Sequence, residues 1–156
     1  MKRFTAISLI IVLFLMLLPV WALSAATNLS ALATSAVSIF FGPRLPNDDY
    51  AWGNCTYWAA LRRIQVGQPI PNTWGNAITW AERARADGYI VDHTPAVDAI
   101  MQDPNALGGL GHVAFVEKVN PLNGSWTISE MNRIGFDEVD QRVMPAAAAV
   151  QYNFIH

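Results

Sequence analysis

The chain has very little that could cross-link it or bind a metal ion. It contains one cysteine, Cys55, among 156 residues, so no internal disulfide can form and the fold must be held by packing. It has no CxxC pair, no HExxH motif and no glycine-rich phosphate loop after a strand. One cysteine with one well-placed histidine gives too few ligands for zinc, and the carboxylates of Asp48 and Asp49 do not continue at the spacing of a calcium loop. We therefore expect no metal and no cofactor.

Basic residues are scarce too, and two of the ten lie at the start of the chain. Lys2 and Arg3 precede an apolar run over residues 6–18, and small residues follow at 24–26, as in an export signal. Without this segment, eight basic residues face twelve acidic ones, a net charge of −4, which argues against a nucleic-acid partner. We expect residues 1–26 to be the signal peptide of a secreted protein. The alternative is an uncleaved membrane anchor, since about 18 apolar residues can just span a bilayer.

The rest of the chain divides into a tether and one domain. Residues 27–48 are rich in Ser, Ala, Thr and Asn and end in turn-forming Gly-Pro and Leu-Pro-Asn sequences, which predicts a tether. Residues 49–156 are predicted to form a single domain, which is long enough to build its own core. We expect this domain to be monomeric.

Helices come first in the predicted domain, and strands follow. A helix is predicted over residues 55–65, capped by Asn54 and ended by Gly67. A second helix is predicted over residues 76–87, with Asn76 as its cap and Gly88 after its end. Apolar runs predict strands over residues 89–91, 99–101, 112–119, 125–131 and 150–155, whereas the acidic stretch 137–140 is predicted to be a polar loop. This order indicates an α+β fold with an antiparallel sheet.

The lone thiol of Cys55 lies where the first helix should begin. The nucleophilic form of cysteine is the thiolate. The unpaired N–H groups and the dipole at a helix N-terminus favour negative charge there. Cys55 is therefore a candidate nucleophile. The alternative is a small buried apolar residue without a chemical role.

A histidine and two polar residues on the next strand could complete a catalytic group. His112 opens the apolar run 112–116, which predicts a central strand, and the turn at 120–124 joins it to the strand that ends near Glu130 and Asn132. If His112 lies opposite Asn132 in the hairpin, His112, Glu130 and Asn132 share one face of the sheet. Glu130 or Asn132 would then accept the Nδ1 hydrogen of His112 and orient its ring. A structural histidine and a solvated glutamate are the alternatives.

Aromatic residues gather around the candidate nucleophile. Part of this group must be core, since a helix facing a sheet buries such side chains. The rest could line a groove for an extended glycan or peptide, because amphipathic rings suit wet binding surfaces. The candidate groove residues are Trp52, Tyr57 and Trp74.

Taken together, these residues resemble the cysteine, histidine-dependent amidohydrolase/peptidase (CHAP) family of bacterial cell-wall hydrolases. The resemblance covers nearly all of residues 50–156 and includes the regions of both the cysteine and the histidine. The similar segments are residues 53–59 (GNCTYWA), 74–77 (WGNA), 88–89 (GY), 94–95 (TP), 111–117 (GHVAFVE), 128–132 (ISEMN) and 152–156 (YNFIH).

The resemblance implies a papain-like α+β domain that cleaves amide bonds in peptidoglycan, at the cell wall outside the cell. It places the nucleophile at Cys55, the base at His112 and the orienting acid at Glu130, with a further amide at Asn132. The family commonly has Gln where Asn54 stands, so Asn54 is a candidate to form an oxyanion hole with the Cys55 N–H.

The predicted function is therefore a secreted peptidoglycan hydrolase that cuts an amide bond through a thioester intermediate. Whether the bond joins sugar to peptide or lies within the peptide is open. Two other functions fit the same residues: a non-catalytic wall-binding protein, and an exported cysteine peptidase or toxin that acts on protein.

Overall fold

The computed structural model describes residues 50–156. The predicted signal peptide and the whole of the predicted tether lie outside these residues. Within them, no helix has the length and apolar character needed to cross a membrane.

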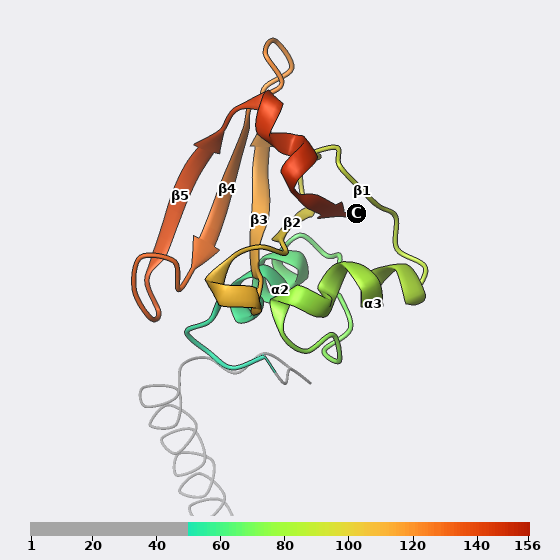
Figure 1. The fold of residues 1–156 in the computed structure, drawn as a ribbon, viewed down its shortest axis with the longest axis vertical. Coiled ribbons are helices and arrows are strands. Elements are labelled where there is room, and N and C mark those ends of the chain that lie inside the picture. Colours follow the sequence, from blue (N-terminus) through green and yellow to red (C-terminus); the bar gives the residue numbers. More distant parts are fainter. Residues whose placement is uncertain (1–49) are drawn as a thin grey trace, which may run out of the picture. The chain divides into compact units, whose positions relative to one another are not determined.

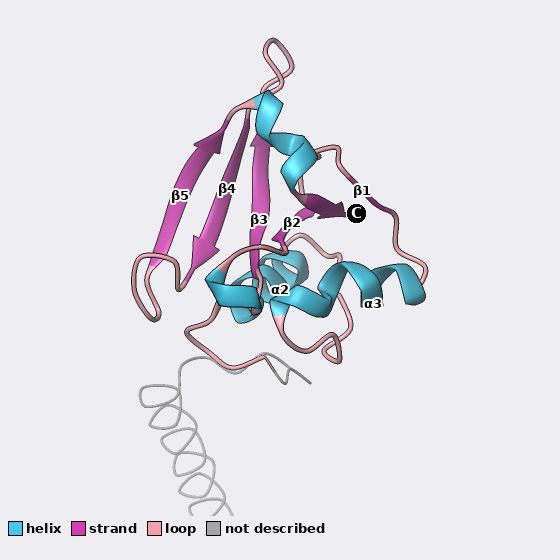
Figure 2. Ribbon diagram, viewed as in Figure 1, coloured by secondary structure: helices cyan, strands magenta, loops and turns pink. Residues whose placement is uncertain are grey.

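Six antiparallel strands form one sheet in the order β1-β6-β2-β3-β4-β5 (Figure 1). The strands are β1 (Val91–Asp92), β2 (Ile100–Asp103), β3 (His112–Val119), β4 (Trp126–Met131), β5 (Val139–Met144) and β6 (Asn153–Ile155). The helices are α2 (Cys55–Gln65) and α3 (Trp80–Ala86), with 3₁₀ turns η1 (Ala77–Thr79), η2 (Leu107–Gly109) and η3 (Ala146–Gln151) (Figure 2). The predicted α+β fold is confirmed.

The helix α2 has the predicted bounds. Ala59 and Ala60 favour a helix and are buried where α2 packs against β3. The chain leaves the helix at Gly67, whose φ of 75° is a conformation that glycine adopts without strain. Asn54 occupies the N-cap position, but its side chain makes no capping hydrogen bond. The same holds for Asn76 before η1, so both predicted side-chain caps are wrong.

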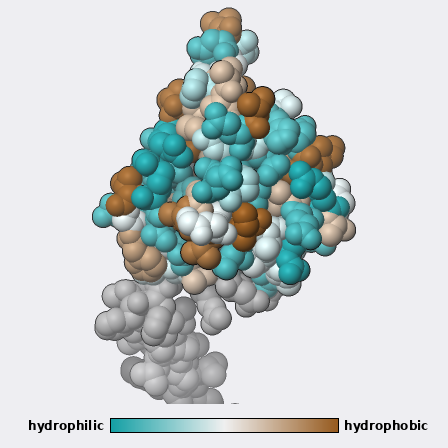
Figure 3. Space-filling view, viewed as in Figure 1, coloured by the Kyte–Doolittle hydropathy of each residue, from teal (hydrophilic) through white to brown (hydrophobic). Residues whose placement is uncertain are grey.

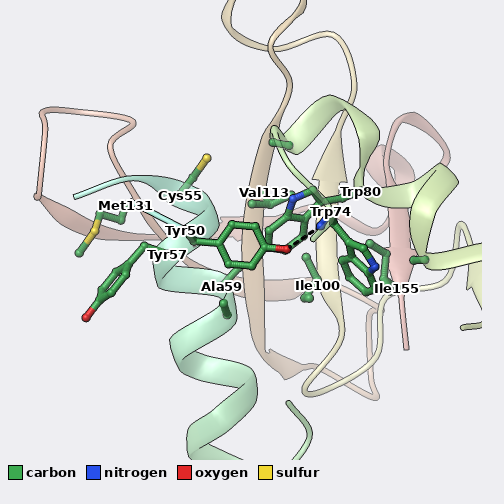
Figure 4. Close-up of a cluster of buried hydrophobic side chains, with 13 residues drawn as sticks. Tyr50, Cys55, Tyr57, Ala59, Trp74, Trp80, Ile100, Val113, Met131 and Ile155 are labelled. Atoms are coloured by element: carbon green, nitrogen blue, oxygen red, sulfur yellow. Dashed lines mark hydrogen bonds between the residues drawn. The ribbon is translucent and has the colours of Figure 1, made fainter. Parts of the chain in front are cut away.

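The core consists of two clusters of buried side chains. One joins the helices to Ile100, Val113 and Ile155 of the sheet (Figure 4). The other contains Trp126 and Phe154 and is packed against residues of η3. On the face shown in Figure 3, apolar residues form small patches separated by polar ones.

Two of the aromatic residues predicted to line a groove belong to this core. Trp74 is 0% exposed and packs against the rings of Trp80 and Tyr89, with its indole N–H donating to Asp87. Tyr57 is 2% exposed, and Figure 4 shows it pointing away from Cys55. Successive helix residues are rotated by about 100°, so a residue two positions after the nucleophile points to another side of α2.

Residues 137–140 are not simply a polar loop, because β5 begins at Val139. Asp140 pairs with Glu130 in the ladder between β4 and β5. The second predicted helix is divided into η1 and α3. The last predicted strand is shorter than expected, since residues 146–151 form η3 and only Asn153–Ile155 form β6.

Candidate active site

Cys55 is the first residue of α2 and is buried, with 7% of its surface exposed (Figure 4). Burial alone would raise the pKa of the thiol, because it disfavours the charged form. The hydrogen bond and charge of His112, together with hydrogen bonds from the backbone of Val113 and Thr56, outweigh burial and lower this pKa. The thiol is thus set up to ionise more readily than an ordinary cysteine.

His112 lies between Cys55 and Glu130. Its Nε2 is 2.8 Å from Glu130 Oε2, and 4% of its surface is exposed. Burial opposes the charged ring, but hydrogen bonds and charge interactions with Cys55 and Glu130 raise the pKa of His112 to about 9. Because the thiol pKa of Cys55 is lowered and the imidazole pKa of His112 is raised, the pair favours a thiolate beside an imidazolium over two neutral groups.

The hairpin has the predicted register but not the predicted ring orientation. Phe115 pairs with Ser129 and Val116 with Ile128, which is the alignment that sets Ala114 opposite Glu130. A bulge follows after Val116 rather than at the turn. Glu130 contacts Nε2 of His112, not Nδ1 as predicted. The same imidazole also hydrogen-bonds to Cys55, so the ring has one partner on each side, and Nδ1 is the nitrogen that Glu130 does not contact.

Glu130 is fully buried and is contacted by three cationic side chains. Besides His112, the Nε of Arg133 lies 2.9 Å from Oε1, and Arg142 donates from Nε to Oε1 and from Nη2 to Oε2. Burial would raise the pKa of this carboxyl, but hydrogen bonds from His112 and Arg142 lower it to about 2. Glu130 is therefore ionised at neutral pH despite being buried.

Asn132 does not share the role of Glu130. Its φ of 62° turns the chain out of β4, and its Nδ2 donates to Asn54 Oδ1 at 3.0 Å. Asn54 in turn donates from Nδ2 to the carbonyl of Ala51 at 3.2 Å. An amide nitrogen carries two hydrogens, so the second hydrogen of Asn54 is available to a ligand, and Asn132 fixes the direction of that amide.

A cleft of about 630 Å³ opens beside the cysteine. Its walls include Cys55, Asn54, Asn132, Asn72, Asn76 and Leu110. Over the described residues 50–156, no Lys, Arg, Asp or Glu lines this cleft. Trp52 is half-buried against the ring of Phe136, with centroids 5.9 Å apart, and is not part of the lining. The cleft thus suits an uncharged, amide-bearing group next to the thiol.

Among the described residues, no three His, Cys, Asp or Glu side chains lie close enough to hold a metal ion.

The family model described as CHAP domain matches residues 45–132, more than half of the sequence and both Cys55 and His112. The chain belongs to the CHAP domain family. Similar proteins include the probable autolysin LDP of Staphylococcus aureus, 49% identical over 107 residues, which cover 69% of this chain and 37% of that protein. The staphylococcal secretory antigen SsaA of the same species is 44% identical over 131 residues, covering 83% of this chain and 49% of the antigen.

A solved structure has the same fold as this CHAP domain. The N-acetylmuramoyl-L-alanine amidase of Staphylococcus aureus matches with a TM-score of 0.64 and 39% identity, over 68% of this chain and 30% of the amidase chain. The fold is therefore the papain-like α+β fold that the sequence predicted. The chain spans half or less of the length of these relatives.

Arg133 and Arg142 of this CHAP domain are two residues of the site that were not predicted from the sequence. A signal was present, because Asp140 and Arg142 alternate with Val139, Gln141 and Val143 as in a strand with one polar face. The prediction of a loop at 137–140 hid that alternation.

The paired ionisation of Cys55 and His112 predicts an unusual thiol titration. Cys55 is the only cysteine, so the ultraviolet absorbance of the thiolate reports on this one site. We expect its midpoint below the usual value of about 8.5, with the ion pair persisting until His112 loses its proton near pH 9. In His112→Gln the midpoint should rise, while in His156→Gln, a matched change at the last residue, it should not. An unchanged midpoint in His112→Gln would contradict the pairing.

Proposed function

We propose that this CHAP domain protein hydrolyses an amide bond of peptidoglycan, with Cys55 as nucleophile and His112 as general acid and base. The observation that supports this most is the chain of contacts from Cys55 to His112 to Glu130 at the edge of an uncharged cleft. The same arrangement of nucleophile, base and orienting carboxylate serves acyl transfer on unrelated folds. The relatives named as an autolysin and as an N-acetylmuramoyl-L-alanine amidase support peptidoglycan as the substrate.

The proposed reaction has two steps. The Cys55 thiolate attacks the amide carbonyl carbon, and the C–N bond breaks while the His112 imidazolium gives its Nδ1 proton to the leaving amine. This leaves an acyl thioester on Cys55. His112, now neutral, removes a proton from water, and the resulting hydroxide attacks the thioester. The C–S bond breaks, a carboxylic acid is released, and the Cys55 thiolate is restored beside the His112 imidazolium. Glu130 stabilises the imidazolium and holds the ring in place.

The negative oxygen formed in each step needs hydrogen-bond donors. The backbone N–H of Cys55, at the start of α2, and the second Nδ2 hydrogen of Asn54 are the proposed donors. Asn132 supports this role indirectly, because its hydrogen bond holds the Asn54 amide. Donors of this kind stabilise the transition state by about 3–4 kcal/mol each.

We also propose that the protein works at the cell wall after export. Its first 26 residues have the pattern of a signal peptide, and a relative is named a secretory antigen. Peptidoglycan is reached only outside the cytoplasmic membrane, so the proposed substrate and the proposed location agree.

The test is to incubate the purified protein with isolated peptidoglycan and to identify the released fragments by mass spectrometry. We expect fragments with new amine and carboxylic acid ends, whose masses tell cleavage between sugar and peptide from cleavage within the peptide. The control is the same protein alkylated with iodoacetamide, which reacts fastest with thiols, and Cys55 is the single cysteine of this sequence. The alkylated protein should release nothing.

Three outcomes would contradict the proposal. Equal release by the alkylated protein would exclude a cysteine mechanism. Binding of both forms to the wall without release would indicate a wall-binding protein. Release from an unrelated protein substrate, with none from peptidoglycan, would indicate a peptidase acting on proteins.

A further inference from the structure

Glu130 has contacts beyond the one with His112, and these contacts need a separate explanation. Its side chain is 0% exposed, and both carboxylate oxygens are contacted by cations. Arg142 reaches both oxygens from the edge strand β5, with Nε to Oε1 and Nη2 to Oε2, the latter at 3.2 Å. A planar guanidinium that binds both oxygens fixes the plane of the carboxylate as well as its charge.

The register of the sheet explains how Arg142 reaches this site. Asp140 lies opposite Glu130 in the ladder, and Arg142 lies opposite Ile128, two residues earlier on β4. Residues two apart on a strand share a face, so the Arg142 side chain reaches Glu130 diagonally across the pair of strands. Oε2, which accepts from Arg142 Nη2, is also the oxygen that contacts His112 Nε2.

Arg133 also contacts Glu130, but its guanidinium is shared. It lies 2.9 Å from Glu130 Oε1 and also donates to Asp140 from Nε at 3.1 Å and from Nη2. Its contact involves Oε1 alone, so it can add positive charge without fixing the rotation of the carboxylate. The charged or titratable groups around Glu130 are thus His112 on β3, Arg142 and Asp140 on β5, and Arg133 after β4, with Cys55 on α2 beyond the imidazole.

We propose that Arg142 is a positioning residue of the active site, which keeps Glu130 ionised and turned toward His112 by holding both of its oxygens. The proposal rests on the proposed function, since Glu130 matters there as the partner of the imidazolium. Without Arg142, the buried carboxylate of Glu130 would keep only His112 and Arg133 as cationic partners and would take up a proton more readily. A neutral Glu130 would no longer stabilise the imidazolium, and the Cys55 thiolate would then lose its counter-ion.

The experiment measures the rate at which iodoacetamide alkylates Cys55 as a function of pH, in the wild type and in Arg142→Met. This rate follows the thiolate fraction and needs no substrate. The loss of a neighbouring arginine raises the pKa of a carboxylate by about 1–3 units. Because the thiolate depends on Glu130 through His112, we expect the acidic midpoint of the Arg142→Met profile to rise in the same direction, by about one pH unit. The acidic limb of hydrolysis should move in the same direction.

Matched variants separate positioning from a general effect on the fold. Arg142→Lys keeps the charge but not the two-point contact, so its midpoint should lie between those of the wild type and Arg142→Met. Arg83→Met removes an exposed arginine from α3 and should leave the profile unchanged. Thermal unfolding establishes that each variant is folded.

A folded Arg142→Met protein with the wild-type midpoint would overturn the inference. If Arg142→Met does not fold, Arg142→Lys decides, and an unshifted midpoint there overturns it as well. The experiments distinguish a failure of the role proposed for Arg142 from a failure of the proposed function. A shifted alkylation profile in a protein that releases no peptidoglycan fragments would count against the proposed function alone, whereas wild-type hydrolysis with an unshifted Arg142→Met profile would count against Arg142 alone.

Discussion

Replacing Cys55 with alanine is expected to reduce release of peptidoglycan fragments by about 10,000-fold or more, which is the scale of loss when a nucleophile that works with its base is removed. The expectation follows from the position of the thiol, which opens on the cleft and is paired with His112. The fold should remain, because alanine favours a helix and Cys55 is a small side chain at the start of α2. Hydrolysis rates and thermal unfolding of both proteins measure the two effects.

The variant Cys55→Ser is the sharper control for this result. Serine is close to cysteine in size, but its hydroxyl ionises far less readily than a thiol whose pKa is lowered by its surroundings. We therefore expect it to be nearly as inactive as Cys55→Ala, although it retains a group that can contact His112. Both variants should still sediment with isolated peptidoglycan. Substantial hydrolysis by either variant would show that Cys55 is not the nucleophile.

The parts of the fold that could be predicted are those determined by neighbours in the sequence. The helix at 55–65 and the strand at 112–119 were predicted with the bounds that the structure has. Both are marked by local patterns: alanines between a polar start and a glycine in the helix, and an apolar run after a glycine in the strand. The turn at 120–124 then set the register that brings Glu130 to His112. This explains why Glu130 could be predicted, together with Asn132, as a candidate partner of His112, although the ring nitrogen that it contacts could not.

The parts that could not be predicted depend on contacts between distant segments. The edge strand β5 buries little, so Val139–Met144 has a polar sequence whose strand character comes from pairing with β4. With β5 unrecognised, the approach of Arg142 to Glu130 was hidden. The same holds for Trp74, because only the packing of Trp80 and Tyr89 around it decides that it lies in the core.

The loop before His112 gives the second large expected effect, that of Gly111→Ala. Gly111 has a φ of 73°, and a Cβ at this position would lie 2.5 Å from the backbone N of Ile78 and 2.7 Å from its Cα. The left-handed conformation costs about 1–2 kcal/mol for alanine, and forcing a methyl group into a packed site costs about 1–3 kcal/mol more. We expect Tm to fall by at least about 10 °C, and hydrolysis to fall with it, because His112 is the next residue.

The neighbouring backbone has little freedom to move away from this methyl group. The Ile78 N–H donates to the carbonyl of Leu110 at 2.9 Å. The carbonyls of Ala77 and Ile78 both accept from the side chain of Gln102, which is 1% exposed and is itself held by Asn153. The clash should therefore be relieved by displacing Gly111, and with it the start of β3, rather than η1.

Gly108→Ala is the matched control, since it separates backbone strain from the clash. Gly108 lies in the same loop with a φ of 63°, but a Cβ there would meet nothing within 4 Å. Only the conformational cost of about 1–2 kcal/mol applies, so its Tm should fall less than that of Gly111→Ala, and its hydrolysis rate at temperatures below unfolding should be close to that of the wild type. Equal losses of Tm in the two variants would mean that η1 shifts enough to make room for the new methyl group at no measurable cost. In that case the contact between Gly111 and Ile78 would not be what holds His112 beside Cys55.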